Sequence, residues 1–170
     1  DHNSRARALN ELQNALNLPQ APLRIECYDM SHLQGTDYVG SMVVMEDGLS
    51  KKREYRRFRI RNASGNDDYA AMAEALRRRY VRVKKSEVPM PDLLLVDGGK
   101  GQLSEALTVL EELELDWLQV VAIAKGKSRK VGKEQLFLAG MSTPTILTSD
   151  SPALLLIQHI RDEAHRFAIT

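Results

Sequence analysis

The sequence predicts an α/β protein built on a mixed sheet, with three antiparallel strands first, parallel strands after them, and helices on both faces. Apolar and polar residues alternate over residues 23–29 and, less regularly, over residues 54–61, which is the pattern of half-buried strands, and residues 38–46 suit another strand between them. Over residues 67–80 the spacing of apolar residues becomes helical. Residues 91–102, PDLLLVDGGKGQ, then join a buried strand to a glycine turn and a helix, which is half of a βαβ unit.

Helical spacing also marks the beginning of the chain. Residues 4–18 predict a leading helix, and Pro19 and Pro22 interrupt its pattern. We therefore expect residues 1–20 to form a leading helix or linker remnant and residues 21–170 to form the domain. The apolar face of this helix comprises Ala8, Leu9, Leu12, Ala15 and Leu16.

The three early strands should pair in hairpin order. The first is predicted to end at Asp29, because its alternating apolar row closes there. Asp47 and Gly48 form a hairpin signal after the second strand. Residues 49–53 make that connection longer than a tight turn.

The later part of the chain alternates helices with strands. Strands at residues 93–96 and 118–124 should run parallel to the first strand, linked by right-handed helical crossovers. Residues 135–138 and 145–147 suit short strands, and Ser151 should cap a terminal helix. The inward face of the helix over residues 67–80 comprises Ala70, Met72 or Ala73, and Leu76.

The composition is that of one globular domain with a real core: 170 residues, 43% apolar and 28% charged. A net charge of +1 does not by itself indicate a nucleic-acid partner, but basic residues cluster in residues 51–61, 77–85 and 125–133. Cys27 is the only cysteine, which excludes an internal disulfide and is compatible with a reducing cytosol. The apolar runs are too short for a signal peptide or a membrane span.

Two acids follow predicted strands. Asp29 ends the first strand, and Asp97 ends the strand that leads into the glycine turn. If those strands are neighbours, both carboxylates lie at the end of the sheet where ligands bind. Carboxylates that close together repel each other, and a divalent cation such as Mg²⁺ would hold them and act on a phosphate. The alternatives are a strand-end cap for Asp29 and a turn residue for Asp97.

Two further residues are candidates for the same site. Asp68 opens the helix over residues 67–80 and could be a third acid, although acids at a helix start also simply stabilise the helix. His165 lies three residues after Asp162 in the terminal helix. It could act as a metal ligand or proton carrier, or it could pair with Asp162 or Glu163 on a solvated face.

Basic residues near the predicted strand ends are candidate phosphate contacts. Lys100 lies in the glycine turn, and a basic run follows the strand at residues 118–124. A charge run is, however, as often a solvated loop. DGGKGQ is not a P-loop, because its glycines are too close together and no Ser or Thr follows the lysine. The candidates in the basic run are Lys125, Lys127, Arg129 and Lys130.

Seven stretches, in order along the chain after its first twenty residues, carry the motifs of one family. They are RIECYDMSHLQGT (24–36), EYRRFRI (54–60), NDDYAAM (66–72), RRRY (77–80), PDLLLVDGGKGQL (91–103), AIAKG (122–126) and SPALLLIQHIRDEAHRFAI (151–169). Together they closely resemble the C-terminal endonuclease domain of UvrC, a protein of the bacterial excinuclease ABC. The resemblance implies a ribonuclease-H-like fold and hydrolysis of a DNA phosphodiester, with Mg²⁺ or Mn²⁺, on the 5′ side of a lesion. It implies an active site of Asp29, Asp68, Asp97 and His165.

The resemblance also implies partners. These are damaged double-stranded DNA and UvrB, the latter through a module that the 170 residues do not include. The family's GIY-YIG nuclease module and helix-hairpin-helix pair are likewise missing, so we expect weak, salt-sensitive DNA binding through basic loops. Competing hypotheses are a non-catalytic DNA-binding or docking module, a nucleotide-binding ATPase, and another nuclease of the same fold, such as a resolvase or transposase.

Overall fold

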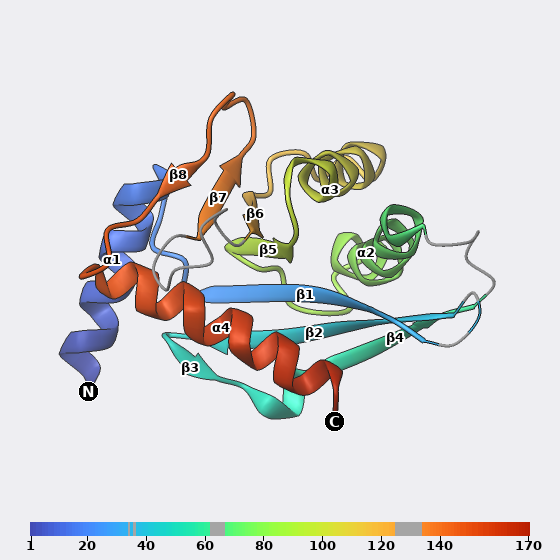
Figure 1. The fold of residues 1–170 in the computed structure, drawn as a ribbon, viewed down its shortest axis with the longest axis horizontal. Coiled ribbons are helices and arrows are strands. Elements are labelled where there is room, and N and C mark those ends of the chain that lie inside the picture. The colour runs from blue at the N-terminus through green and yellow to red at the C-terminus, as the bar shows by residue number, and fades with distance from the viewer. Residues whose placement is uncertain (34, 36, 62–66, 125–133) are drawn as a thin grey trace.

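The computed structural model describes residues 1–33, 35, 37–61, 67–124 and 134–170. These form one mixed sheet with helices against both of its faces (Figure 1). The helices are α1 (His2–Leu16), α2 (Asp68–Lys84), α3 (Lys100–Glu112) and α4 (Pro152–Ala168), with a short 3₁₀ helix, η1 (Lys52–Glu54). The strands are β1 (Arg24–His32), β2 (Tyr38–Glu46), β3 (Leu49–Ser50), β4 (Arg56–Ile60), β5 (Leu93–Asp97), β6 (Val120–Ala124), β7 (Gln135–Leu138) and β8 (Thr145–Ile146).

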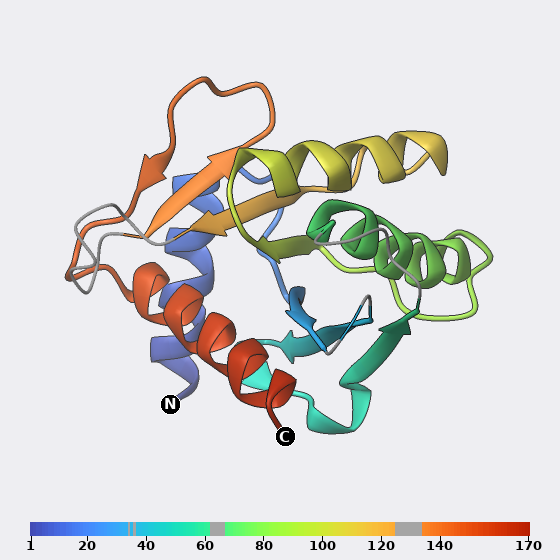
Figure 2. The same ribbon diagram turned by 45° about the vertical axis from the view of Figure 1, so that its right-hand side comes forward.

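The sheet has the strand order β3-β2-β1-β5-β6-β7-β8, and β4 also pairs with β2. β2 is antiparallel to β1 and β4 is antiparallel to β2, whereas β5 is parallel to β1 and β6 is parallel to β5. The predicted mixed sheet is therefore confirmed. β7 and β8 extend it antiparallel beyond β6. α2 and α3 cover one face and α4 the other, with α1 packed beside α4 (Figures 1 and 2).

The helices bury most of the faces that their apolar spacing indicates, although Ala15 of α1 and Leu155 of α4 are exposed. α2 continues four residues past its predicted end at Tyr80, because Val83 adds another buried contact to the core. α4 begins as predicted, with the Ser151 hydroxyl accepting a hydrogen bond from the Ala153 amide at 3.1 Å. Among the described helices, none is long and apolar enough to cross a membrane. The buried residues of α1 are Leu9, Leu12 and Leu16.

β1 is longer than predicted. Its pairing with β5 stops one residue before Asp29, but its pairing with β2 continues to His32. Asp29 therefore lies inside β1, although the neighbouring strand β5 ends beside it. α2 supports the extension by packing closely over Gly40, where an added Cβ would lie 3.2 Å from the Cβ of Ala75.

The turn after β2 is tighter than predicted. Asp47 and Gly48 have φ angles of 52° and 77°, as in a two-residue type I′ hairpin turn. The two residues after them, which the sequence placed in a longer connection, pair back with β2 as β3. η1 then leads to β4, so this strand begins at Arg56 rather than at Glu54.

Candidate active site

Asp29 and Asp97 lie side by side at the centre of the sheet. β1 and β5 are neighbouring parallel strands whose paired register ends at Tyr28 and Val96, and the next residue of each is an aspartate. The sequence left the adjacency of these strands as a condition, and the pairing of β1 with β5 meets it. His165 of α4 reaches the same point, because one ligand atom from each of Asp29, Asp97 and His165 lies within 4.8 Å of the others.

Two side chains of α4 contact Asp97. The His165 Nε2 lies 2.6 Å from Asp97 Oδ2, and the Arg161 Nε donates to Asp97 Oδ1 at 3.3 Å. His165 thus has an acidic partner on the sheet, rather than Asp162 or Glu163 on its own helix. The His165 side chain is 41% exposed and that of Asp97 is 17% exposed, so the pair is open to solvent from the histidine side.

Arg161 is a site residue that the sequence reasoning missed. It is buried, with 8% of its surface exposed, and its guanidinium fixes the orientation of the Asp97 carboxylate. Arg161 and His165 are four residues apart and therefore lie on one face of the helix. That spacing was the available signal, because a helix that turns His165 toward the sheet turns Arg161 the same way.

The carboxyl group of Asp29 resists ionisation. Burial, and then the neighbouring Asp97 carboxylate, raise the pKa of Asp29 to about 7, and the charges of His165 and Arg161 only partly oppose this. A divalent cation would displace the proton, because metal ligands bind in their deprotonated forms. Mg²⁺ takes carboxylate and phosphate oxygens, and imidazole nitrogen suits transition metals. These side chains therefore fit a divalent cation.

The two acids at the start of α2, Asp67 and Asp68, make different contacts. Asp67 Oδ1 accepts a hydrogen bond from the Ala70 amide at 3.0 Å, so Asp67 caps α2. Asp68 instead lines a cavity of about 200 Å³ that both strand aspartates also line. Burial and a hydrogen bond to the Asp68 carboxylate raise the pKa of Tyr38 on β2. Asp68 therefore borders the site, outside the three-residue cluster that converges within 4.8 Å.

The glycine turn forms part of the same cavity, which Gly98 and Gln102 line. Gly98 has a φ of 150°, a conformation that side chains disfavour, and the Gln102 Oε1 accepts a hydrogen bond from the Gly99 amide at 2.9 Å. The Nζ of Lys100 donates to the carbonyl oxygen of Ser142 at 2.9 Å, which ties it to the segment between β7 and β8. The other predicted phosphate contacts, Lys125, Lys127, Arg129 and Lys130, lie outside the described residues.

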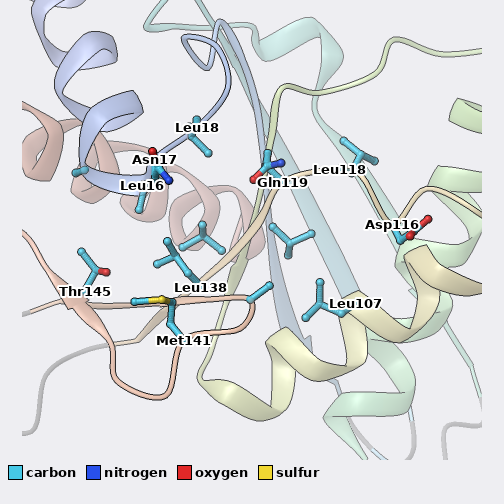
Figure 3. A pocket seen from close by; sticks show the side chains of 14 residues that line it. Leu16, Asn17, Leu18, Leu107, Asp116, Leu118, Gln119, Leu138, Met141 and Thr145 are labelled. Atoms are coloured by element: carbon cyan, nitrogen blue, oxygen red, sulfur yellow. The ribbon is translucent and has the colours of Figure 1, made fainter.

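A larger cavity, of about 430 Å³, lies between the end of α1, α3 and the strands β6 and β7 (Figure 3). Its walls are mostly apolar, and Asp116 is the one charged side chain among the described residues that line it. This cavity therefore lacks the paired carboxylates that a divalent cation requires. Side-chain chemistry, rather than volume, places the candidate site at Asp29 and Asp97.

The last turns of α4, which carry the site histidine, are held by Tyr55, which lies just before β4, and by Arg57 of β4. The Tyr55 hydroxyl donates to Glu163 Oε2 at 2.6 Å. Arg57 donates to the Phe167 carbonyl oxygen at 2.8 Å, and its guanidinium lies 3.8 Å from the centre of the Phe167 ring. The hydrogen bond from Arg166, and more weakly that from Tyr55, lowers the pKa of Glu163 to about 2. The helix is thereby fixed on both sides of the histidine.

Replacing Tyr55 with phenylalanine should destabilise the protein by about 2 kcal/mol at pH 7, because a hydrogen bond to an ionised carboxylate is lost while the ring remains. The pKa of Glu163 lies below its ordinary value, so its contribution to stability is present above about pH 4 and fades as the pH falls toward 2. Urea unfolding of both proteins at pH 7 and pH 3 measures this. An equal loss at the two pH values would contradict the assigned bond.

Residues 13–169 match the family described as the UvrC RNAse H endonuclease domain. The chain belongs to this family. All four predicted active-site residues fall inside the matched range, and membership of a family of UvrC endonuclease domains supports a nuclease.

Relatives of this UvrC domain are much longer proteins. The UvrABC system protein C of Methylococcus capsulatus is 51% identical over 165 residues, which cover 97% of this chain and 27% of that protein. The UvrABC system protein C of Nitrosococcus oceani is 53% identical over 158 residues, which cover 93% of this chain and 26% of that protein. The chain thus spans about a quarter of the length of these relatives.

Solved structures of other proteins resemble the UvrC domain only distantly. Endonuclease V from Streptomyces avermitilis has a TM-score of 0.48 and 13% identity, covering 98% of this chain and 92% of that chain. The ribonuclease-H-like assignment rests instead on the strand order and on the family match. The predicted fold class is therefore confirmed.

Proposed function

We propose that this chain carries a divalent-metal-dependent endonuclease site that hydrolyses a DNA phosphodiester on the 5′ side of a lesion, during nucleotide excision repair. The observation that carries the proposal is the convergence of Asp29, Asp97 and His165 ligand atoms within 4.8 Å. The substrate would be damaged double-stranded DNA, and UvrB would be a partner through other parts of a longer protein. The names of the relatives, UvrABC system protein C, support this assignment.

In the proposed mechanism, Asp29 and Asp97 would hold Mg²⁺ or Mn²⁺ through carboxylate oxygens, and Asp68 would supplement them. His165 acts through its Nε2, as a ligand or by carrying a proton, and Arg161 keeps the Asp97 carboxylate oriented toward the site. The cation, when bound, would supply charge stabilisation to the phosphate and favour deprotonation of the attacking water.

Other side chains prepare this site for a phosphodiester. Asp68 lines the same cavity as Asp29 and Asp97, so its carboxylate would face the bound phosphodiester. The partial exposure of His165 leaves the cluster accessible to a large substrate. Lys100 and the basic run over residues 125–133 remain predicted phosphate contacts, which would hold the DNA strand without reading its sequence.

The experiment that tests this proposal uses an end-labelled duplex with a single bulky lesion. The longer protein that includes this chain is added with its UvrABC partners. We expect a nick on the 5′ side of the lesion that disappears with EDTA and returns with excess Mg²⁺ or Mn²⁺. Nicking that persists in EDTA would reject the metal, and metal-independent DNA binding without any nick would support the non-catalytic docking module instead.

A further inference from the structure

β1, β2 and β4 continue beyond the end of β5 as a three-stranded arm, formed by residues 30–32, 38–41 and 57–60. One face of this arm packs on α2, where Tyr38 and Ile60 are buried with Ala71 and Ala75. The arm reaches past the C-terminal end of α4, which covers the opposite face of the sheet (Figures 1 and 2). Beyond its C-terminal end, α4 therefore does not cover the opposite face of the arm.

Arginines of β4 lie on that opposite face. Arg57 does so, because its guanidinium stacks on Phe167 of α4. Side chains two residues apart on a strand share a face, so Arg59 extends the row, and its side chain is 59% exposed. Arg61 follows directly after the strand and is also exposed. We call Arg57, Arg59 and Arg61 the arginine strip.

The strip is continuous with the candidate active site. Asp29 pairs with Ser41 on β2, and Ser41 pairs with Arg57 on β4. Directly paired residues place their side chains on one face, so Arg57 shares a face with Asp29, about 10 Å away across two strand spacings. The remaining arginines lead away from the acids along the arm.

Acids compensate the strip less than they compensate the basic residues of α2. Arg59 meets Asp37 with 3.4 Å between the charged atoms, an exposed pair that a phosphate could displace. Arg57 is engaged by neutral acceptors, the Phe167 carbonyl and the Thr170 hydroxyl. The α2 pairs are Arg77–Glu112, Arg82–Glu87 and Lys84–Glu114.

From this placement, we propose that the arginine strip binds the phosphate backbone of the DNA duplex next to the bond that is cut. The inference rests on the proposed function, and it adds the surface that orients the substrate. A row of exposed guanidiniums beside an acidic site suits a polyanion, because it attracts the phosphates that flank the scissile one while the acids would take a metal ion. Backbone contacts of this kind carry no sequence preference.

The test compares two double variants of the chain. Arg59→Gln with Arg61→Gln removes two charges of the strip, and Arg77→Gln with Arg82→Gln removes two exposed charges of α2 as a matched control. Affinity for a fluorescent duplex is measured from 50 to 200 mM salt. Each lost phosphate contact lowers the slope of log affinity against log salt by about 0.9, so we expect a decrease of about 1.8 for the strip variant and an unchanged slope for the control.

Mn²⁺ titration of the same samples shows whether each variant retains a folded site. A nicking assay is run separately, because it tests the proposed nuclease function and not DNA binding by the arginine strip. Three results would overturn the proposal for the arginine strip: an unchanged slope in the strip variant, an equal decrease in the control, or no duplex binding by the unmodified chain. A decrease confined to the strip variant supports it, even if the unmodified chain proves unable to nick DNA, a result that would reject only the nuclease function.

Discussion

Replacing Asp97 with asparagine is expected to reduce metal-dependent nicking of DNA at least about a hundredfold. Loss of an outer partner of a metal ligand typically costs ten- to a hundredfold, and Asp97 is proposed as a direct ligand. It is also the residue that His165 and Arg161 both contact, so the variant would remove the negative charge that both α4 side chains face. Rates of nicking at saturating Mn²⁺ measure the effect.

The matched control for this variant is Asp162→Asn. Asp162 is an exposed acid in α4, three residues before His165, and was the alternative partner suggested by sequence spacing. Because His165 contacts Asp97 instead, the Asp162 variant should keep nicking within about twofold of the unmodified protein. An Asp97 variant that retains more than a tenth of the activity would remove this residue from the site.

Replacing Asp29 with asparagine should also abolish nicking, yet it should stabilise the metal-free protein at pH 8. The pKa of Asp29 is raised to about 7, so the folded state binds its proton more tightly than the unfolded state does. Stability is therefore lost as the pH rises from about 4 to about 7. Allowing for partial exposure, the loss is on the order of 2 kcal/mol, which the neutral amide relieves.

Thermal unfolding in EDTA measures the expected change in stability. The Asp29→Asn protein should unfold about 4–8 °C higher than the unmodified protein at pH 8, with little difference at pH 5, where Asp29 is already protonated. Excess Mn²⁺ should favour the unmodified protein instead, because it alone keeps both carboxylate ligands. A lower unfolding temperature for the variant at pH 8 would show that Asp29 and Asp97 do not repel each other.

Much of the site could be predicted because it depends on strand direction. In the sequence, Asp29 and Asp97 each close a short segment with the pattern of a strand, and parallel neighbouring strands end at the same edge of a sheet. The spacing of residues along the chain does not, however, show that the two strands are neighbours. Pairing between β1 and β5 supplies that fact. The family resemblance implies Asp68 and His165 as further active-site residues, and these roles stay predictions.

Features that depend on packing against distant elements were harder to predict. The apolar alternation of β1 closes at Asp29, yet the strand continues to His32 because β2 and α2 support it from elsewhere in the chain. We expected Lys100 to contact a phosphate. Its hydrogen bond to the carbonyl oxygen of Ser142 could not be predicted, because Ser142 lies far along the chain. Leu155 is 62% exposed because the apolar run over residues 154–157 is wider than the face of α4 that meets the sheet.

The direct measurement of the proposed ion site is a crystal structure of the protein soaked in Mn²⁺, with anomalous scattering collected at the manganese edge. An anomalous peak within bonding distance of carboxylate oxygens from both β1 and β5 is the predicted result, with the α4 imidazole beside it. Full Mn²⁺ occupancy elsewhere on the molecule, with no peak between these two strands, would contradict a metal centre at this edge of the sheet.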